Sequence, residues 1–281
     1  MVTGQRRPAD EPGWSPAGHG LVGVADAGAF LARLNRLDRT AVVRLRSVPP
    51  SESPGGVHRT ALWARLPWNV LVGRMVAGVG PGDVTVAVRD LLAELARNGT
   101  DLPYRRDADW RWPLPPSASR VVEMLPGAEL RRIAAAAAGT LRSAEASGVG
   151  GRAVGQRAVR DALLDHVAVV VTQPAADGAP PVQAEVSQRL VQGIVRMGFL
   201  GPAGPAERAA ATEGTADADG TPTVGSIADA GGTEPAGVPG DSPVQVRLAG
   251  NWIGLSAPYG VAWSLKVSNL VMRPVQVPPN G

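Results

Sequence analysis

The sequence contains no cysteine and only one lysine, Lys266, among its 281 residues. The absence of cysteine excludes disulfides, zinc–thiolate sites, iron–sulfur clusters and cysteine nucleophiles. Phe and Tyr are scarce, with two of each, so seven Trp supply most of the aromatic surface. Hydrophobic residues make up 44% of the chain and are mainly Val, Leu and Ala. This supply is large enough for a buried core.

Signatures of catalysis, metal binding and membrane insertion are missing too. The three histidines form no HxxxH or HExxH motif, and G-x-S-x-G does not occur. The first twenty residues are polar, and no apolar run approaches the roughly 18 residues of a spanning helix. We therefore expect a cytoplasmic protein that uses no cofactor and no metal and has no membrane partner. A binding protein is favoured over an enzyme, and no catalytic residue is assigned.

Charge is distributed unevenly along the chain. The formal net charge is +3, but residues 201–241 hold seven acidic residues and one basic residue, a net charge of −6. The remainder of the chain therefore carries +9. A basic folded part beside an acidic segment favours anionic partners, unless the acidic segment shields it.

Periodicity and turn residues predict one α+β domain over residues 21–268, with small antiparallel sheets and four or five helices. Tails are expected at 1–20 and 269–281. A disordered acidic insertion, 201–243, is expected between the first part of the domain, 21–200, and a C-terminal hairpin, 244–268. Helices are predicted at 25–37, 81–99, 126–148, 153–166 and between Ser187 and Gly198. Strands are predicted at 40–47, 60–78 (broken near Pro67), 167–172, 182–186, 244–257 and 258–268.

The helix that follows Ser187 carries the sharpest functional signal. One of its faces is apolar, and the opposite face carries Arg189, Gln192 and Arg196. Arg and Gln are the side chains that read guanine and adenine in the major groove. A hairpin after such a helix, turning at Asn251, is the order of elements in a winged helix.

Two observations oppose the winged-helix hypothesis. A polar face is what every surface helix has. A helix-turn-helix also joins its helices by only 3–4 residues, whereas a strand and a loop separate residue 166 from Ser187. We keep Arg189, Gln192, Arg196 and Asn251 as candidate nucleic-acid contacts.

Two other stretches are candidate binding segments. In YRRDADWRWPLPP, residues 104–116, arginines alternate with Tyr104, Trp110 and Trp112. Bases could stack there, but two aspartates and the prolines favour a loop that two indoles pin to the core. The glycine-rich stretch GVGGRAVG, residues 148–155, is typical of a turn, and Arg152 within it is a candidate anion-binding residue.

The stretches LWARLPWNVLVGRMVAG, DADWRWPLPP, GGRAVGQRAVRDALLDHVAVVVT and QRLVQGIVRMGFLG together resemble a group of uncharacterised proteins of high-GC actinobacteria. The resemblance covers residues 22–200 and 244–264. It implies no activity, cofactor or partner and supports only the limits of the folded part.

Three functions remain open at this point. The first is a non-enzymatic binding or regulatory protein, with a winged-helix-like module that contacts nucleic acid as its most specific version. The second is a protein–protein adaptor that uses the Trp-rich loop and the acidic insertion. The third is an enzyme that acts on a small anionic molecule through arginine and backbone donors.

Overall fold

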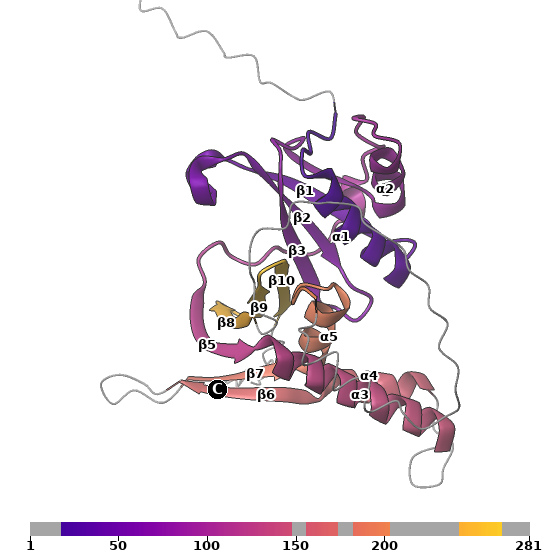
Figure 1. The fold of residues 1–281 in the computed structure, drawn as a ribbon, viewed down its shortest axis with the longest axis vertical. Coiled ribbons are helices and arrows are strands. Elements are labelled where there is room, and N and C mark those ends of the chain that lie inside the picture. Colours follow the sequence, from indigo (N-terminus) through magenta and orange to yellow (C-terminus); the bar gives the residue numbers. More distant parts are fainter. Residues whose placement is uncertain (1–17, 148–155, 174–181, 203–241, 266–281) are drawn as a thin grey trace, which may run out of the picture. The chain divides into compact units, whose positions relative to one another are not determined.

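The computed structural model, drawn in Figure 1, describes residues 18–147, 156–173, 182–202 and 242–265. By their internal contacts the residues form two compact units. We call Met1–Pro67 with Gly73–Trp112 the N-terminal unit, and Trp68–Val72 with Pro113–Gly281 the C-terminal unit. Where the sequence predicts one domain, the contacts thus divide the chain after Trp112.

Most of the predicted tails and of the acidic insertion lies outside the described residues. Residues 18–20 of the predicted N-terminal tail are described, and His19 among them is buried. The His19 amide donates to the carbonyl of Thr100 at 2.9 Å, and its ring atom Nε2 lies 2.9 Å from the carbonyl oxygen of Gly99. One buried histidine bound to backbone leaves no periodic signal, which is why the tail was predicted to be longer.

The N-terminal unit is a sheet with two helices. Its elements are α1 (Val24–Leu37), β1 (Val42–Val48), the short 3-10 turns η1 (Pro50–Glu52) and η2 (Pro54–Gly56), β2 (Arg59–Arg65), β3 (Leu71–Ala77), β4 (Asp83–Ala87), α2 (Val88–Ala96) and the 3-10 turn η3 (Asp107–Asp109). The strands lie in the order β4-β1-β2-β3, and β1 is antiparallel to both of its neighbours. The predicted strands at 40–47 and 60–78 and the helix at 25–37 are confirmed.

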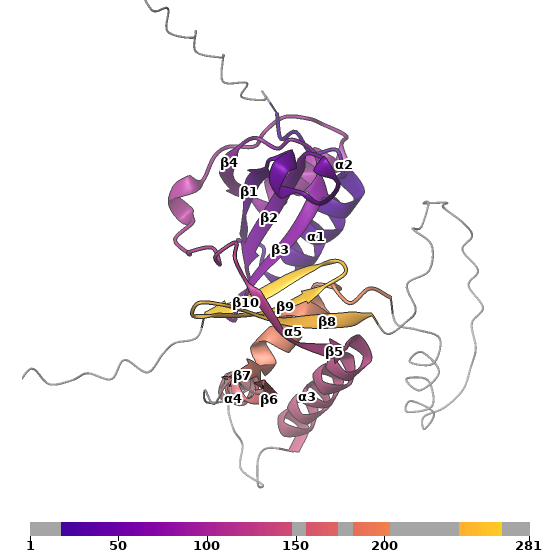
Figure 2. The same cartoon turned by 90° about the vertical axis from the view of Figure 1, so that its left-hand side faces the viewer.

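The two faces of this sheet differ because side chains alternate along each strand. Val43 and Leu45 of β1 are fully buried on one face, which α1 and α2 cover (Figure 2). Arg44 and Arg46 therefore point to the other face, which we call the outer face. Arg44 is paired there with Trp63 of β2.

The predicted helix over residues 81–99 is wrong in its first half. Residues 83–87 form β4, and the helix α2 begins only at Val88. Val84 and Val86 are buried in pairs with β1. The valine-rich strand β4 runs directly into helix α2, so their apolar residues together mimic the spacing of one long helix. The β-branched valines of residues 83–87 favour the strand. Asp83 lies at the start of β4.

The C-terminal unit contains a four-stranded sheet, a separate hairpin and three helices. Its elements are β5 (Arg120–Pro126), α3 (Gly127–Ser147), α4 (Gln156–Asp165), β6 (Val167–Gln173), β7 (Val182–Ser187), α5 (Gln188–Arg196), β8 (Pro243–Ala249), β9 (Trp252–Ala257) and β10 (Gly260–Leu265). The sheet has the order β10-β9-β8-β5, and β6 pairs with β7. Five α-helices and antiparallel strands in the described residues confirm the α+β class.

Helix α5 is the centre of the C-terminal unit. It contacts β9 and β10 on one side and α3, α4 and β7 on the other, as Figure 2 shows. It ends in a Schellman stop: the Phe199 amide donates to the carbonyl of Ile194, and Gly198 has a positive φ of 66°. Phe199 and Ile194 are both fully buried, as the hydrophobic contact of that motif requires.

Two glycines accommodate the rings of tryptophans on neighbouring strands. Gly254 of β9 is paired with Trp263 of β10, and a Cβ atom on Gly254 would lie 2.4 Å from the indole. A Cβ atom on Gly73 of β3 would lie 2.6 Å from the ring of Trp63. Glycine inside a strand marks such a close approach. Each indole therefore covers its glycine.

Candidate functional site

The polar face predicted for α5 is not bare. Gln192 is only 9% exposed, and its Nε2 atom donates to the carbonyl of Ala134 on α3 at 3.2 Å. Gly193 beside it is buried as well. The expectation of an uncovered polar face is therefore wrong. The sequence could not show this, because the covering helix α3 lies more than fifty residues earlier in the chain.

Arg189 is engaged within the C-terminal unit. Its Nε atom donates to Oδ1 of Asp165 at 2.6 Å, and its NH1 atom donates to the carbonyl of Trp68 at 3.1 Å. The indole of Trp68 in turn donates to the carbonyl of Arg189 at 3.0 Å. The hydrogen bond from Arg189 lowers the pKa of Asp165 below its usual value. Arg189 thus joins three segments of the unit.

Arg196 and Asn251 are exposed, whereas Gln192 is buried. Arg196 donates to Oε1 of Gln192 at 3.2 Å, and its guanidinium lies 5.5 Å from the ring centroid of Trp68. Asn251 occupies the predicted two-residue turn between β8 and β9, since Ala249 pairs with Trp252. Strand β9 of this hairpin contacts α5, and its residues Ile253 and Leu255 are buried. Arg152 lies outside the described residues.

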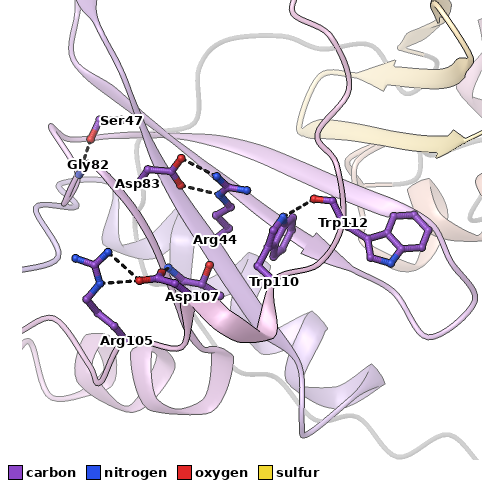
Figure 3. A network of polar contacts seen from close by, with 9 residues as sticks. Arg44, Ser47, Gly82, Asp83, Arg105, Asp107, Trp110 and Trp112 are labelled. Atoms are coloured by element: carbon purple, nitrogen blue, oxygen red, sulfur yellow. Dashed lines mark hydrogen bonds and ion pairs between the residues drawn. The ribbon is translucent and has the colours of Figure 1, made fainter.

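A different group of residues comes together on the outer face of the N-terminal sheet. The segment 105–112 runs along the edge of β4 and onto this face (Figure 3). The Arg106 amide donates to the carbonyl of Thr85 at 2.7 Å, and the Thr85 amide donates to Oδ1 of Asp107 at 2.6 Å. These bonds fix the segment to β4 before it reaches Trp110.

Two arginines of the sheet hold the two indoles of this segment. The Arg44 guanidinium lies 5.8 Å from the ring centroid of Trp110, and that of Arg65 lies 4.3 Å from the ring centroid of Trp112. Trp110 also donates from Nε1 to the carbonyl of Trp112 at 2.6 Å. Both indoles are half-buried. We call this group the tryptophan–arginine face, made of Arg44, Arg46, Arg65, Trp110 and Trp112, together with Arg111, which lies between the two tryptophans in the sequence.

Ion pairs order the arginines around this face. Arg44 donates to both carboxylate oxygens of Asp83, at 2.6 and 2.7 Å (Figure 3). These hydrogen bonds, with the charges of Arg46 and Arg105 nearby, lower the pKa of Asp83 below its usual value. Arg105 pairs with Asp107 at 2.8 Å. The carboxylates near the face are therefore already bound to arginine.

The face keeps an excess of positive charge. Six arginines (44, 46, 65, 105, 106 and 111) lie in or beside it against three aspartates (83, 107 and 109), a local balance of +3. Arg46 and Arg111 are exposed, and their side chains make no hydrogen bond or ion pair to any described residue. The sequence predicts the pinned loop but not its partners. The sequence pattern that could have indicated the arginine partners is VVRLRS, residues 42–47, in which arginine alternates with apolar residues and therefore lies on the outer face of a strand.

The described residues show no arrangement of acid, base and nucleophile. His58 and His166 are exposed, and buried His19 binds only backbone groups. No group of three His, Asp or Glu side chains in the described ranges is placed to hold a metal ion. None of the helices there has the length and the hydropathy to cross a membrane.

Comparison with family models divides the chain as its contacts do. A model described as a domain of unknown function, DUF8185, matches residues 114–269, more than half of the chain. This chain belongs to the DUF8185 family. A second model of unknown function, DUF8010, matches residues 22–112. No curated protein matches the sequence. The predicted resemblance to an uncharacterised family is thereby confirmed, and the two matches meet where the N-terminal and C-terminal units divide.

Proposed function

We propose that this DUF8185 protein is a non-enzymatic binding protein, an adaptor whose tryptophan–arginine face binds an acidic, extended segment of a partner protein. The observation that carries the proposal is the pair of half-buried indoles, Trp110 and Trp112, each held by an arginine of the sheet. Trp and Arg are the residues most enriched among the hot spots of protein interfaces.

The face is ordered before any partner arrives. Trp110 is held by its own hydrogen bond to the segment and by Arg44, which Asp83 fixes in turn. Binding to side chains that are already fixed costs less conformational entropy than ordering mobile ones. The geometry therefore favours a contact surface over a loop whose only role is to cover the sheet.

The charge of the face favours an acidic partner. Arg46 and Arg111 are exposed and lack a carboxylate partner among the described residues, and the local balance is positive. Unpaired guanidinium groups bind carboxylates in a forked geometry. Complementary charge also speeds the encounter of two proteins.

A single-stranded nucleic acid fits the same face less well. Stacking requires free aromatic faces, but guanidinium groups already lie over one face of Trp110 and one face of Trp112. Rings that are already covered on one face favour a protein segment over a nucleic acid.

The test begins with peptides selected by the full chain from a displayed random library. We expect the selected peptides to be enriched in Asp and Glu beside apolar residues. Fluorescence anisotropy then measures their affinity for Trp112→Ala, which should fall about 30-fold, the effect of removing a hot spot of ~2 kcal/mol.

Two double variants separate the face from general charge. Arg46→Gln with Arg111→Gln should weaken binding, whereas Arg142→Gln with Arg160→Gln removes the same charge from α3 and α4 and should not. Selected peptides without acidic enrichment, or with equal affinity for both double variants, would contradict the proposal. If single-stranded oligodeoxythymidine bound more tightly than any peptide, the partner of the tryptophan–arginine face would be a nucleic acid and the proposal would be wrong.

A further inference from the structure

A second surface of the N-terminal unit is hollowed and basic. The end of α1, the turn after it and the start of α2 border an open hollow of about 480 Å³ on the surface. It is lined by Asn35, Arg36, Arg39 and Arg89. None of these residues belongs to the tryptophan–arginine face, so the hollow can be tested independently of the proposed function.

The arginines of the hollow are short of counter-charges. Arg36 and Arg39 are exposed, and their side chains make no hydrogen bond or ion pair to any described residue. Arg89 has one, a bond of 3.2 Å from Nε to its neighbour Asp90. Asp38, the acid closest in sequence, accepts instead from the amide and the hydroxyl of Thr40. Three guanidinium groups thus share one hollow without a carboxylate in its lining.

The helix dipoles explain only one of the three arginines. Arg36 lies in the last turn of α1, where a cation is stabilised. Arg39 follows the helix, and Arg89 lies in the first turn of α2, where the positive end of the dipole disfavours a cation. Helix α2 also begins without a side-chain cap. The dipole of α2 therefore gives no reason for Arg89 to stand beside Arg36 and Arg39 in this hollow.

We propose that this hollow binds a small phosphate-bearing anion. Its size lies within the roughly 300–1,000 Å³ of small-molecule sites. Guanidinium forks match the oxygens of phosphate in two-bond contacts, which lysine cannot make. Asn35 adds an amide that can donate to the same anion. Because no histidine or carboxylate lines the hollow, the chemistry present supports binding of the anion and no transfer of its phosphate.

Isothermal titration of the full chain with inorganic pyrophosphate tests this site. We expect saturable binding at low ionic strength, with a stoichiometry of one. Arg36→Gln combined with Arg39→Gln should lower the affinity at least about tenfold, since two charge-assisted contacts are lost. Both side chains are exposed, so this variant should keep its fold, and circular dichroism checks that it does.

The matched control is Arg46→Gln with Arg111→Gln, which removes the same charge from the same unit but from the tryptophan–arginine face. When both double variants are compared at about 0.15 M salt, this control should bind pyrophosphate within about twofold of the native chain, because exposed charges more than about 8 Å apart are largely screened there. Absence of binding at low salt would overturn the site. So would an equal loss in both double variants, which would reveal general charge attraction only.

Discussion

The guanidinium of Arg44 lies between the carboxylate of Asp83, to which it donates two hydrogen bonds, and the ring of Trp110, 5.8 Å from its centroid. Asp83 therefore acts on an indole that it does not touch, by fixing the arginine beneath it. A surface ion pair alone contributes about 0–1 kcal/mol to stability. The main effect of the Arg44–Asp83 ion pair is to fix the position of the Trp110 ring.

The first prediction concerns pH. Because Arg44 lowers the pKa of Asp83 in the folded state, the pair stabilises the fold above the ordinary Asp value of about 4, and this contribution is lost as pH falls through the lowered pKa. Asp83→Asn should cost no more than about 1 kcal/mol of unfolding free energy near neutral pH, because the side chains are partly exposed. The difference from the native chain should vanish in acid. Urea titrations near neutral pH and in acid measure the unfolding free energy of both proteins. A difference that persists in acid would show that the Asp83–Arg44 ion pair is not its cause.

The second prediction concerns the glycine beneath Trp263. Gly254→Ala should lower stability by about 1–3 kcal/mol, because the new Cβ atom would overlap the indole. Gly139→Ala is the matched control: no atom lies within 4 Å of its added Cβ, and the site is inside helix α3. That substitution should raise stability by up to about 1 kcal/mol. The midpoint temperatures of thermal unfolding of the two variants should therefore shift in opposite directions. A shift in the same direction would show that contact with the indole is not what destabilises Gly254→Ala.

The third prediction concerns a buried histidine. The ring of His19 accepts a hydrogen bond from the Leu21 amide at Nδ1 and faces the Gly99 carbonyl with Nε2. His19→Ala should cost about 1–3 kcal/mol, because it leaves buried backbone groups without partners. His58→Ala alters an exposed side chain and should change stability by less than about 0.5 kcal/mol. Chemical denaturation distinguishes them, and equal stabilities would show that the contacts of His19 are dispensable.

The fourth prediction concerns Arg189, the residue first expected to touch nucleic acid. Arg189→Ala should destabilise the C-terminal unit by about 1.5–3 kcal/mol, because a charged hydrogen bond to the Trp68 carbonyl is lost with the ion pair. Asp165→Asn removes only the exposed half of this arrangement and should cost less. Urea denaturation followed by tryptophan fluorescence reports both. A larger loss in Asp165→Asn would show that the ion pair, not the backbone bond, stabilises the unit.

Local patterns were enough to predict most of the elements. The C-terminal stop of α5 could be read from Gly198 and Phe199, because a Schellman stop depends on residues within one turn. Ser187 takes the N-cap position but makes no side-chain hydrogen bond there. The hairpin at Asn251 followed from its two-residue turn. By contrast, β5 was missed: it has a bulge between Val121 and Glu123, no regular alternation of burial, and a partner strand more than a hundred residues later.

The candidate site was harder to predict, because it depends on which faces become covered. Arg189, Gln192 and Arg196 have the spacing of a recognition helix, but only the placement of α3 decides that Gln192 is buried. Trp110 and Arg44 are far apart in the sequence and meet because β1 and β4 are neighbours in the sheet. No local pattern contains that information.

The C-terminal unit takes in Trp68–Val72, which lie within the sequence matched by DUF8010. Trp68 supplies the carbonyl for Arg189 and the ring beside Arg196. A gene fragment that encoded only residues 114–269 would therefore yield a polypeptide without part of its own interior. The boundary between the two family matches is therefore not a boundary at which the chain can be divided. Transfer of the C-terminal unit into another protein would have to include residues 68–72 as well.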